Sequence, residues 1–431
     1  MNRESFLDYG IVPTGPEGNF TKLSKTQKRY LGLDLTAPLM VDKIEDLRDH
    51  PPNIIIAKCV HTTGFVQNNF KHQVITKKIR YVMGLGIYQQ LVKDKQSGKK
   101  VLEPANIKFR NLYKPYFGES LDNKTLLVWR TGGIGDLGFI QPNLIYLKEK
   151  YPTCKIWFAC GPQYQAMLDN WDCIDLLLDL PFQVKYLEQS NYHALFEGVI
   201  ERCLEAHTKN AYNLFSRWLG LDLPDEKLVP VNKSKEDKLA ENKKILESWG
   251  LSEGEYIAMQ LRASSPVRTP RPDMWRRVCN TLTGRGFKVV ITDTTHKSKM
   301  IEDFIGELDR KEMVFNYAQH SKSLDCTIAL VDKAKLVVST DSSLMHIAAS
   351  LGTPAFGIYG PFPGEIRLTT YKNVDWTNCV CACAPCFMHG SKPCKNSKSG
   401  HGVCYDNVNL DEMLFKIDKL LNDKEISGDL K

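Results

Sequence analysis

A glycine-rich run at residues 133–138 has the composition of a loop that binds a phosphate or a sugar. Its sequence, GIGDLG, fits the pattern G-x-G-x-x-G and follows an apolar run at residues 125–129. Glycines such as Gly133 and Gly135, placed between a strand and a helix, let the backbone approach a ligand at the helix amino terminus. Asp136 places a carboxylate among these glycines. Two interpretations follow for it: a general base, or a charge that favours the helix dipole.

The same run does not predict a nicotinamide cofactor. A dinucleotide-binding fold needs an acidic residue about 20 positions further on, at the end of the second strand. In this chain that strand ends in Ala-Cys-Gly-Pro at residues 159–162, which offers no carboxylate.

A second polar group follows another apolar run, at residues 335–339. Asp341, Ser342 and Ser343 stand where a helix is expected to begin, and His346 lies one turn into that helix. The unpaired N–H groups of a helix amino terminus, together with two hydroxyls, are suited to hold a diphosphate. The alternative is a helix cap followed by a core histidine.

Three arginines follow the strand expected at residues 256–260. Arg262, Arg268 and Arg271 lie in a loop that also contains three prolines. Positive charge at a strand end can stabilise the anionic leaving group of a transfer reaction. The alternative is a solvated basic loop.

Six of the 13 cysteines crowd into residues 379–404, with the spacing C-x-C-x-C-x2-C-x7-C-x9-C. The C-x2-C step of Cys383 and Cys386 is common among zinc ligands, and Cys394 and Cys404 would complete a tetrahedral set. In a reducing cytosol a metal is favoured over disulfides. We therefore expect a structural zinc, while reduced packing cysteines and disulfides stay open as alternatives.

The elements that must position these residues alternate between apolar strands and amphipathic helices, which predicts doubly wound parallel α/β sheets. In such sheets ligands bind at the carboxyl ends of the strands, so a cleft between two such domains is expected to hold them. Residues 79–91 are expected to form a helix, and Ser234 and Asp237 a capping box. The domains we expect are a leading segment of unknown fold at 1–123, a first Rossmann-like domain at 124–232, a linker helix at 233–252, a second Rossmann-like domain at 253–378, the Cys-rich segment at 379–404 and a final helix within 405–431.

Both motifs together resemble a known enzyme family. The run Arg130 to Asp136, followed by Pro142, is similar to the amino-terminal signature of the heptosyltransferases, glycosyltransferase family 9. The run Asp341 to Pro354, with Gly360-Pro361 closing the next strand, is similar to that family's carboxyl-terminal signature. The similarity covers about residues 124–421.

The resemblance implies a GT-B fold, in which two Rossmann-like domains face a central cleft. It implies that residues 124–232 form the acceptor domain and residues 253–378 the nucleotide-sugar domain. It also implies inversion at the anomeric carbon, a nucleotide-sugar donor, and no metal or other cofactor in catalysis. Asp136 then corresponds to the base that acts on the acceptor hydroxyl. The residues that we expect to bind the donor come from both motifs and from the loop that carries the three arginines. They are Gly133, Gly135, Arg262, Arg268, Arg271, Asp341, Ser342, Ser343 and His346.

Composition limits the remaining choices. The chain of 431 residues is 42% hydrophobic and 25% charged, with a net charge of +7. These values are typical of a soluble globular protein, and no window is apolar enough for a membrane span, so a cytoplasmic location is expected. The acceptor we expect is a saccharide or a lipid-linked saccharide. A hydroxymethylated base in DNA is an alternative, because the leading segment is rich in lysine, and a binding module without turnover is another.

Overall fold

The computed structural model describes residues 42–49, 54–66, 72–92, 98–107, 109–388 and 393–422. By its internal contacts the chain divides into two compact units. The first comprises Met1–Gly132 and Asn143–Leu223, and the second comprises Gly133–Pro142 and Pro224–Lys431. Among the described residues no helix has the length and apolar character needed to cross a membrane.

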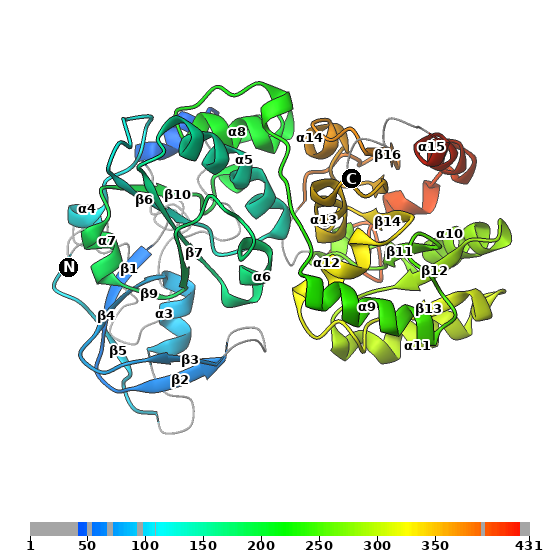
Figure 1. The fold of residues 1–431 in the computed structure, drawn as a ribbon, viewed down its shortest axis with the longest axis horizontal. Helices are drawn as coiled ribbons and strands as arrows, with labels where there is room; N and C mark the ends of the chain where they lie inside the picture. The colour runs from blue at the N-terminus through cyan, green and yellow to red at the C-terminus, as the bar shows by residue number, and fades with distance from the viewer. Residues whose placement is uncertain are drawn as a thin grey trace. The chain divides into compact units, whose positions relative to one another are not determined.

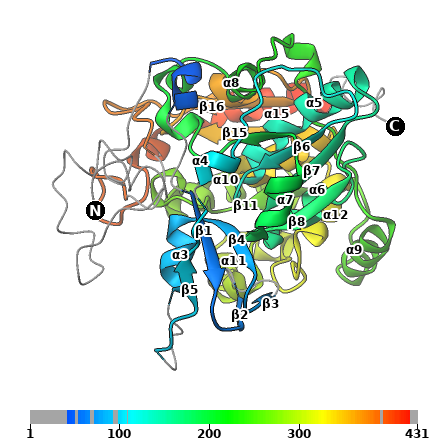
Figure 2. The same ribbon diagram turned by 90° about the vertical axis from the view of Figure 1, so that its left-hand side faces the viewer.

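The first unit contains an antiparallel sheet built mainly from the leading segment. Its strand order is β5-β1-β4-β9, and α3 packs against β1 and β4 (Figure 2). The strands and helix are β1 (Ile54–Cys59), β4 (Arg80–Gly84), β5 (Leu102–Pro104), β9 (Phe182–Gln183) and α3 (Leu85–Leu91). A separate hairpin pairs β2 (Thr63–Val66) with β3 (His72–Ile75).

The second sheet of this unit is parallel, with the order β10-β6-β7-β8. Its strands are β6 (Thr125–Trp129), β7 (Lys155–Cys160), β8 (Leu176–Asp179) and β10 (Tyr192–Leu195). The helices around it are α4 (Phe109–Leu112), the part of α5 (Ile134–Lys150) from Asn143 onward, α6 (Gln165–Leu168), α7 (Val184–Gln189) and α8 (Ala211–Trp218).

One apolar core joins the two sheets of the first unit. Ile54, Ile56 and Val82 of the antiparallel sheet pack in the same cluster as Leu127 and Trp129 of the parallel sheet. Because β9 lies between β8 and α7 in the chain and pairs with β4, the leading segment is integrated into this unit through its backbone as well.

The second unit is built on one six-stranded parallel sheet with the order β13-β12-β11-β14-β15-β16 (Figure 1). Its strands are β11 (Tyr256–Gln260), β12 (Lys288–Ile291), β13 (Val314–Asn316), β14 (Leu336–Thr340), β15 (Ala355–Tyr359) and β16 (Val374–Asn378). This is a doubly wound order: the chain runs outward from β11 in one direction and then from β14 in the other.

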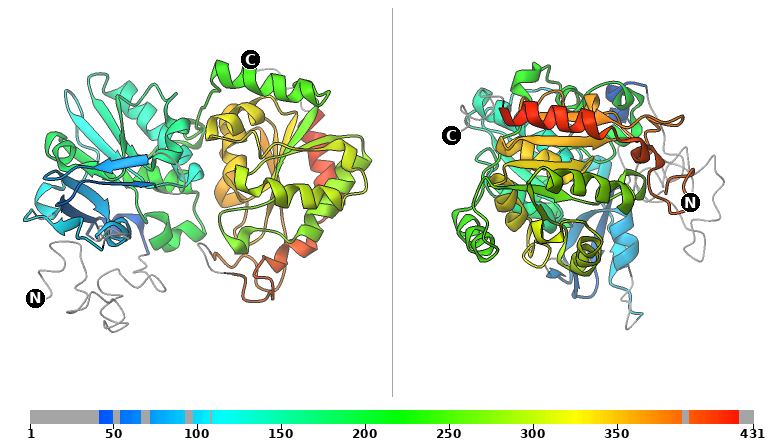
Figure 3. Two further views of the ribbon diagram at one scale, coloured as in Figure 1. Left: turned by 90° about the horizontal axis from the view of Figure 1, so that it is seen from below. Right: turned by 90° about the vertical axis from the view of Figure 1, so that its right-hand side faces the viewer.

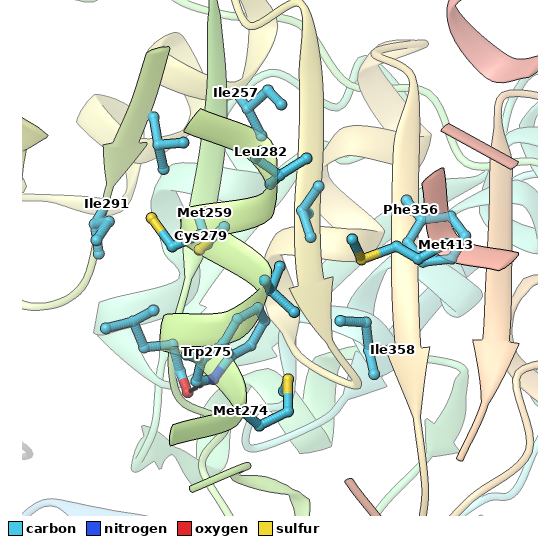
Figure 4. Close-up of a cluster of buried hydrophobic side chains, with 14 of the residues drawn as sticks. Ile257, Met259, Met274, Trp275, Cys279, Leu282, Ile291, Phe356, Ile358 and Met413 are labelled. Atoms are coloured by element: carbon cyan, nitrogen blue, oxygen red, sulfur yellow. Dashed lines mark hydrogen bonds between the residues drawn. The ribbon is translucent and has the colours of Figure 1, made fainter. Parts of the chain in front are cut away.

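The helices of this unit cover both faces of the sheet. They are α9 (Glu236–Ser248), α10 (Pro272–Gly284), α11 (Ser298–Gly306), α12 (Leu324–Asp332), α13 (Ser343–Leu351), α14 (Glu365–Leu368) and α15 (Leu410–Asn422). Alternate strand residues such as Ile257 and Met259 form a core with α10, α11 and α15, as the period of two in a strand requires. Figure 4 shows α10 contributing Trp275, and Met413 of α15 lying close to Phe356. Figure 3 shows α15, in red, beside the strands that it covers.

Two local expectations were wrong. Residues 79–91 are not one helix, because 80–84 form β4, whose buried Tyr81, Val82 and Met83 pair with β1, and the helix begins only at Leu85. Helix α9 has no capping box: its N-cap is Lys235, and no side chain there caps it. The strands and helices expected between residues 256 and 359, and the final helix, were confirmed to within a few residues.

Candidate active site

The second unit places its candidate residues at the point where the strand order reverses. Strands β11 and β14 are neighbours at the centre of the sheet, and from them the chain winds in opposite directions. In open parallel sheets this switch point, at the carboxyl strand ends, is where ligands bind. The loop of residues 261–271, which carries Arg262, Arg268 and Arg271 and is called the arginine loop below, begins directly after β11. Asp341 follows directly after β14.

Ser342 bonds the two strand ends together. Its hydroxyl donates to Gln260 Oε1 at 2.9 Å and lies 2.8 Å from the hydroxyl of Ser339. It also accepts from the backbone N–H of Leu344, which makes Ser342 the N-cap of α13. The cap was one of the two interpretations of this residue. It does not exclude a diphosphate, because other N–H groups of the first turn remain.

Arg268 and Asp341 form a nearly buried ion pair at this edge of the sheet. The Arg268 Nη1 atom donates to the carbonyl oxygen of Asp341 at 3.0 Å and to its Oδ2 at 3.2 Å. The Nη2 atom donates to Ser264 Oγ, and Nε has no partner among the described residues. The guanidinium is therefore fixed in orientation by three hydrogen bonds.

The charges of this cluster set the ionisation of its members. Burial alone would raise the pKa of Asp341, but the guanidinium groups of Arg268 and Arg367 outweigh it and hold that pKa below its usual value. Burial lowers the pKa of His346 to about 4, although Asp341 opposes the shift. Near neutral pH the site therefore contains a carboxylate and an uncharged imidazole, whose Nδ1 has no partner among the described residues.

The other two arginines of the loop are paired more loosely. The Nε atom of Arg262 lies 3.7 Å from Oδ2 of Asp293, which follows β12. Arg271 pairs with Asp406 at 2.8 Å and is 42% exposed. Asp293 therefore competes only weakly with an anionic ligand for Arg262, whereas Arg271 already binds Asp406 in a structural ion pair.

The glycine motif begins helix α5 rather than preceding it. Gly133 has a φ of +90°, and a Cβ placed there would overlap the carboxylate of Asp136, which lies in the first turn. A Cβ on Gly135 would come within 2.7 Å of the His346 ring, and Phe139 packs edge-on against that ring at 5.0 Å. Because residues 133–142 belong to the second unit, the structure brings the two sequence motifs together within it.

The residues just before the glycine motif are held within the first unit by a neighbouring loop. The buried Arg130 side chain donates to the carbonyl oxygens of Gly132 and Phe196, at 2.9 and 2.7 Å, and pairs with Glu201 at 2.8 Å. Glu197 accepts the backbone N–H of Thr131. Burial raises the pKa of Glu197, against the opposing effects of Arg130 and Thr131.

Sequence reasoning missed several of these residues. Glu197 lies two residues after the end of β10, and Asp293 lies two residues after the end of β12. A search for carboxylates just after strand ends would have found both. Arg367 gave no signal, because α14 is a single short turn and nothing in its sequence marks an electrostatic interaction with Asp341.

The cysteine cluster gathers only in part. Among the described residues, no group of three or more His, Cys, Asp or Glu side chains could hold a metal ion. Cys381 and Cys383 approach each other with their sulfur atoms 3.5 Å apart, while Cys394 and Cys404 are buried. As the structure stands, Cys383, Cys386, Cys394 and Cys404 do not form a ligand set, and the zinc stays a prediction.

About half of the chain matches the sequence model of a known family. Residues 189–397 match the model of glycosyltransferase family 9 (heptosyltransferase). The matched range includes the arginine loop and the whole of α13. This part of the chain is similar to the glycosyltransferase domain of family 9. No curated protein matches the sequence significantly.

Solved structures similar to this chain include two bacterial proteins. One is a family 9 glycosyl transferase from Veillonella parvula, with 15% identity, a TM-score of 0.56, and coverage of 70% of this chain and 98% of its own. The other is the ADP-heptose lps heptosyltransferase II of E. coli, with 15% identity, a TM-score of 0.54, and coverage of 70% and 99%. At this identity the likeness shows the fold: the α/β fold with parallel sheets of the GT-B heptosyltransferases, as predicted.

Proposed function

We propose that this family 9 protein is an inverting glycosyltransferase, which moves a sugar from a nucleotide-sugar donor to an acceptor hydroxyl without a catalytic metal. The observation that carries the proposal is the fixed Arg268 guanidinium beside the amino terminus of α13, at the switch point of a doubly wound sheet. Cations and a helix amino terminus at this position suit a nucleoside diphosphate.

In this account the donor diphosphate lies against α13 and the arginine loop. Arg262 is the half-exposed cation with the weakest internal partner, so we assign it a direct contact with the diphosphate. Arg268 places a positive charge beside the start of α13, and Asp341 keeps that guanidinium oriented. The remaining expected donor residues, Ser343 and His346, lie on the first turn of the same helix.

The transfer step needs one base and stabilisation of one leaving group. Asp136 would take the proton of the acceptor hydroxyl, and that oxygen would attack the anomeric carbon from the face opposite the diphosphate. The bond from the anomeric carbon to the diphosphate oxygen breaks with its electron pair leaving on the oxygen. The arginines and α13 stabilise the negative charge that develops there.

The name of the E. coli relative suggests which substrates to try first. It is an ADP-heptose lps heptosyltransferase, so ADP-heptose is the first donor and a saccharide or lipid-linked saccharide the first class of acceptor. Neither similar structure is described as acting on nucleic acid. Of the lysines that motivated a nucleic-acid acceptor, Lys71 and Lys108 lie outside the described residues.

The proposal is tested by measuring nucleoside diphosphate release from ADP-, UDP-, GDP- and CMP-sugars, with the wild-type protein and Asp136→Asn. The asparagine is isosteric and cannot accept the proton, so we expect donor binding to survive and turnover to fall about 10²–10⁴-fold. Glu149→Gln, an exposed carboxylate near the other end of α5, is the matched control and should be fully active. Donor binding without turnover in the wild type, across a panel of saccharide acceptors, would indicate a binding module instead.

A further inference from the structure

A short 3-10 helix, Val403–Asn407, connects the Cys-rich segment to the candidate donor site. Its Tyr405 side chain is fully buried in the core of the second unit. The Tyr405 hydroxyl lies 2.8 Å from the hydroxyl of Thr340 and 3.2 Å from the carbonyl oxygen of Arg268. Thr340 also approaches that carbonyl, at 3.0 Å. The two hydroxyls and the carbonyl oxygen thus form a triangle of short contacts, in which the two hydroxyl protons make two hydrogen bonds at a time.

This triangle joins the two backbone segments that carry the ion pair of the site. Thr340 is the last residue of β14 and immediately precedes Asp341. The carbonyl belongs to Arg268 itself, whose guanidinium pairs with Asp341. The tyrosine hydroxyl therefore fixes the spacing between the backbones of Arg268 and Asp341, although Tyr405 has no exposed surface with which to touch a donor.

Further contacts on either side of Tyr405 hold the same loop. Asp406 binds Arg271 through both carboxylate oxygens, at 2.9 and 2.8 Å. The N–H of Gly402 donates to the carbonyl oxygen of Thr269 at 3.3 Å. The carboxyl end of the arginine loop is thus bonded to the end of the Cys-rich segment and to the residues that follow it.

We propose that Tyr405 is a positioning residue for the donor, and that the residues following the Cys-rich segment brace the arginine loop through it. The inference rests on the proposed function for what the donor is. Tyr405 keeps the backbones of Arg268 and Asp341 at a fixed spacing, so that the guanidinium binds the diphosphate without rearrangement. A loop that must be ordered on binding costs affinity, and a braced loop avoids that cost.

The first test compares Tyr405→Phe with Tyr256→Phe. Tyr256 is the matched control, because it is equally buried in the same unit and its hydroxyl donates to the carbonyl oxygen of Leu330 at 2.6 Å, in a different contact. We expect similar small losses of thermal stability in both variants. Only Tyr405→Phe should raise the donor KM and the Kd for the nucleoside diphosphate product, by about 10-fold, with the acceptor KM unchanged. Equal donor affinities in the two variants would overturn the proposal.

The second test is a double-mutant cycle with Thr340→Val, which removes the other hydroxyl of the triangle. If both hydroxyls act through one contact, the double variant should bind the nucleoside diphosphate little worse than either single variant. Fully additive losses would contradict a shared triangle.

Hydrogen exchange separates this inference from the proposed function. Tyr405→Phe should speed amide exchange in residues 262–271 of the ligand-free protein, and Tyr256→Phe should not. If the wild-type protein binds no nucleoside diphosphate, the proposed function is wrong, and the exchange result still decides whether Tyr405 braces the loop. Unchanged exchange in that loop would contradict the bracing.

Discussion

A single guanidinium nitrogen of Arg268 binds both the backbone carbonyl and the carboxylate of Asp341, at 3.0 and 3.2 Å. The side chains are only 11% and 5% exposed, so both charges are largely removed from water. Removing a charge from water costs free energy unless an opposite charge lies beside it, and here each charge supplies the partner that the other needs. The pair also places a cation at the centre of the switch point with its direction already set.

Removing one partner of this pair should therefore be expensive. We predict that Asp341→Asn lowers the free energy of unfolding by about 3–5 kcal/mol, because the Arg268 charge is left buried without a counter-ion. Chemical denaturation measures the change. Asp418→Asn is the control: it removes one partner of the exposed pair with Arg285, and its stability should equal that of the wild type within error. Equal effects of the two substitutions would contradict the role of burial.

Gly133 should be intolerant of even one added methyl group. We predict that Gly133→Ala reduces turnover by about 10²-fold or more, because the new Cβ overlaps the Asp136 carboxylate and the φ of +90° is strained for alanine. Gly284→Ala is the matched control, since a Cβ there meets nothing within 4 Å and its φ is not positive. That control should fold and turn over normally. Normal turnover in Gly133→Ala would show that the position of the Asp136 carboxylate is not critical.

His193 should make the first unit sensitive to acid. Its Nδ1 accepts the backbone N–H of Lys114 at 2.7 Å, and burial lowers its pKa to about 4. Because the unfolded histidine has a pKa of about 6.5, the unfolded state binds the proton first, and stability falls as the pH drops from about 6.5 to 4. The loss amounts to about 2 kcal/mol at about pH 5.

Urea unfolding of the wild type and of His193→Asn between neutral and acid pH tests this sign. The asparagine oxygen can accept the same N–H but does not titrate, so the variant should show a flatter dependence on pH. A variant with the same slope as the wild type would mean that another group causes the acid sensitivity.

The cysteine cluster makes a prediction about metal content. We expect protein prepared under reducing conditions to carry about one zinc per chain, held by Cys383, Cys386 and two further cysteines of residues 379–404. Because thiols bind zinc only as thiolates, uptake should release protons and be stronger at higher pH. Elemental analysis decides this, and metal-free protein would leave the cysteines as reduced packing residues.

The sequence predicted the parallel α/β elements because their signals are local. Runs such as residues 256–260 and 335–339 are short and apolar on both faces, as strands of a parallel sheet covered by helices on both faces are expected to be. Strand β4 was missed because its partner β1 lies about 25 residues earlier and its apolar residues continue directly into α3.

The candidate site shows the same division between local and distant signals. Asp341 and Ser342 could be found from a strand end and a helix start. The contact of Arg268 with Asp341, and that of Tyr405 with Thr340, join residues 73 and 65 positions apart, and no local pattern encodes such pairs. Ser342 was assigned to the donor, and the structure adds that its hydroxyl already caps α13.

Calorimetric titration with ADP, UDP, GDP and CDP tests the central claim most directly, that the switch point of the second unit binds a nucleoside diphosphate. The wild-type protein and Arg268→Lys would be titrated side by side, because lysine keeps the charge and loses the fork of donors that meets Asp341 and the ligand. We predict that the wild type binds one of the four, and that the lysine variant binds it about 10-fold or more weakly. No binding by the wild type, or equal binding by both proteins, would contradict the account.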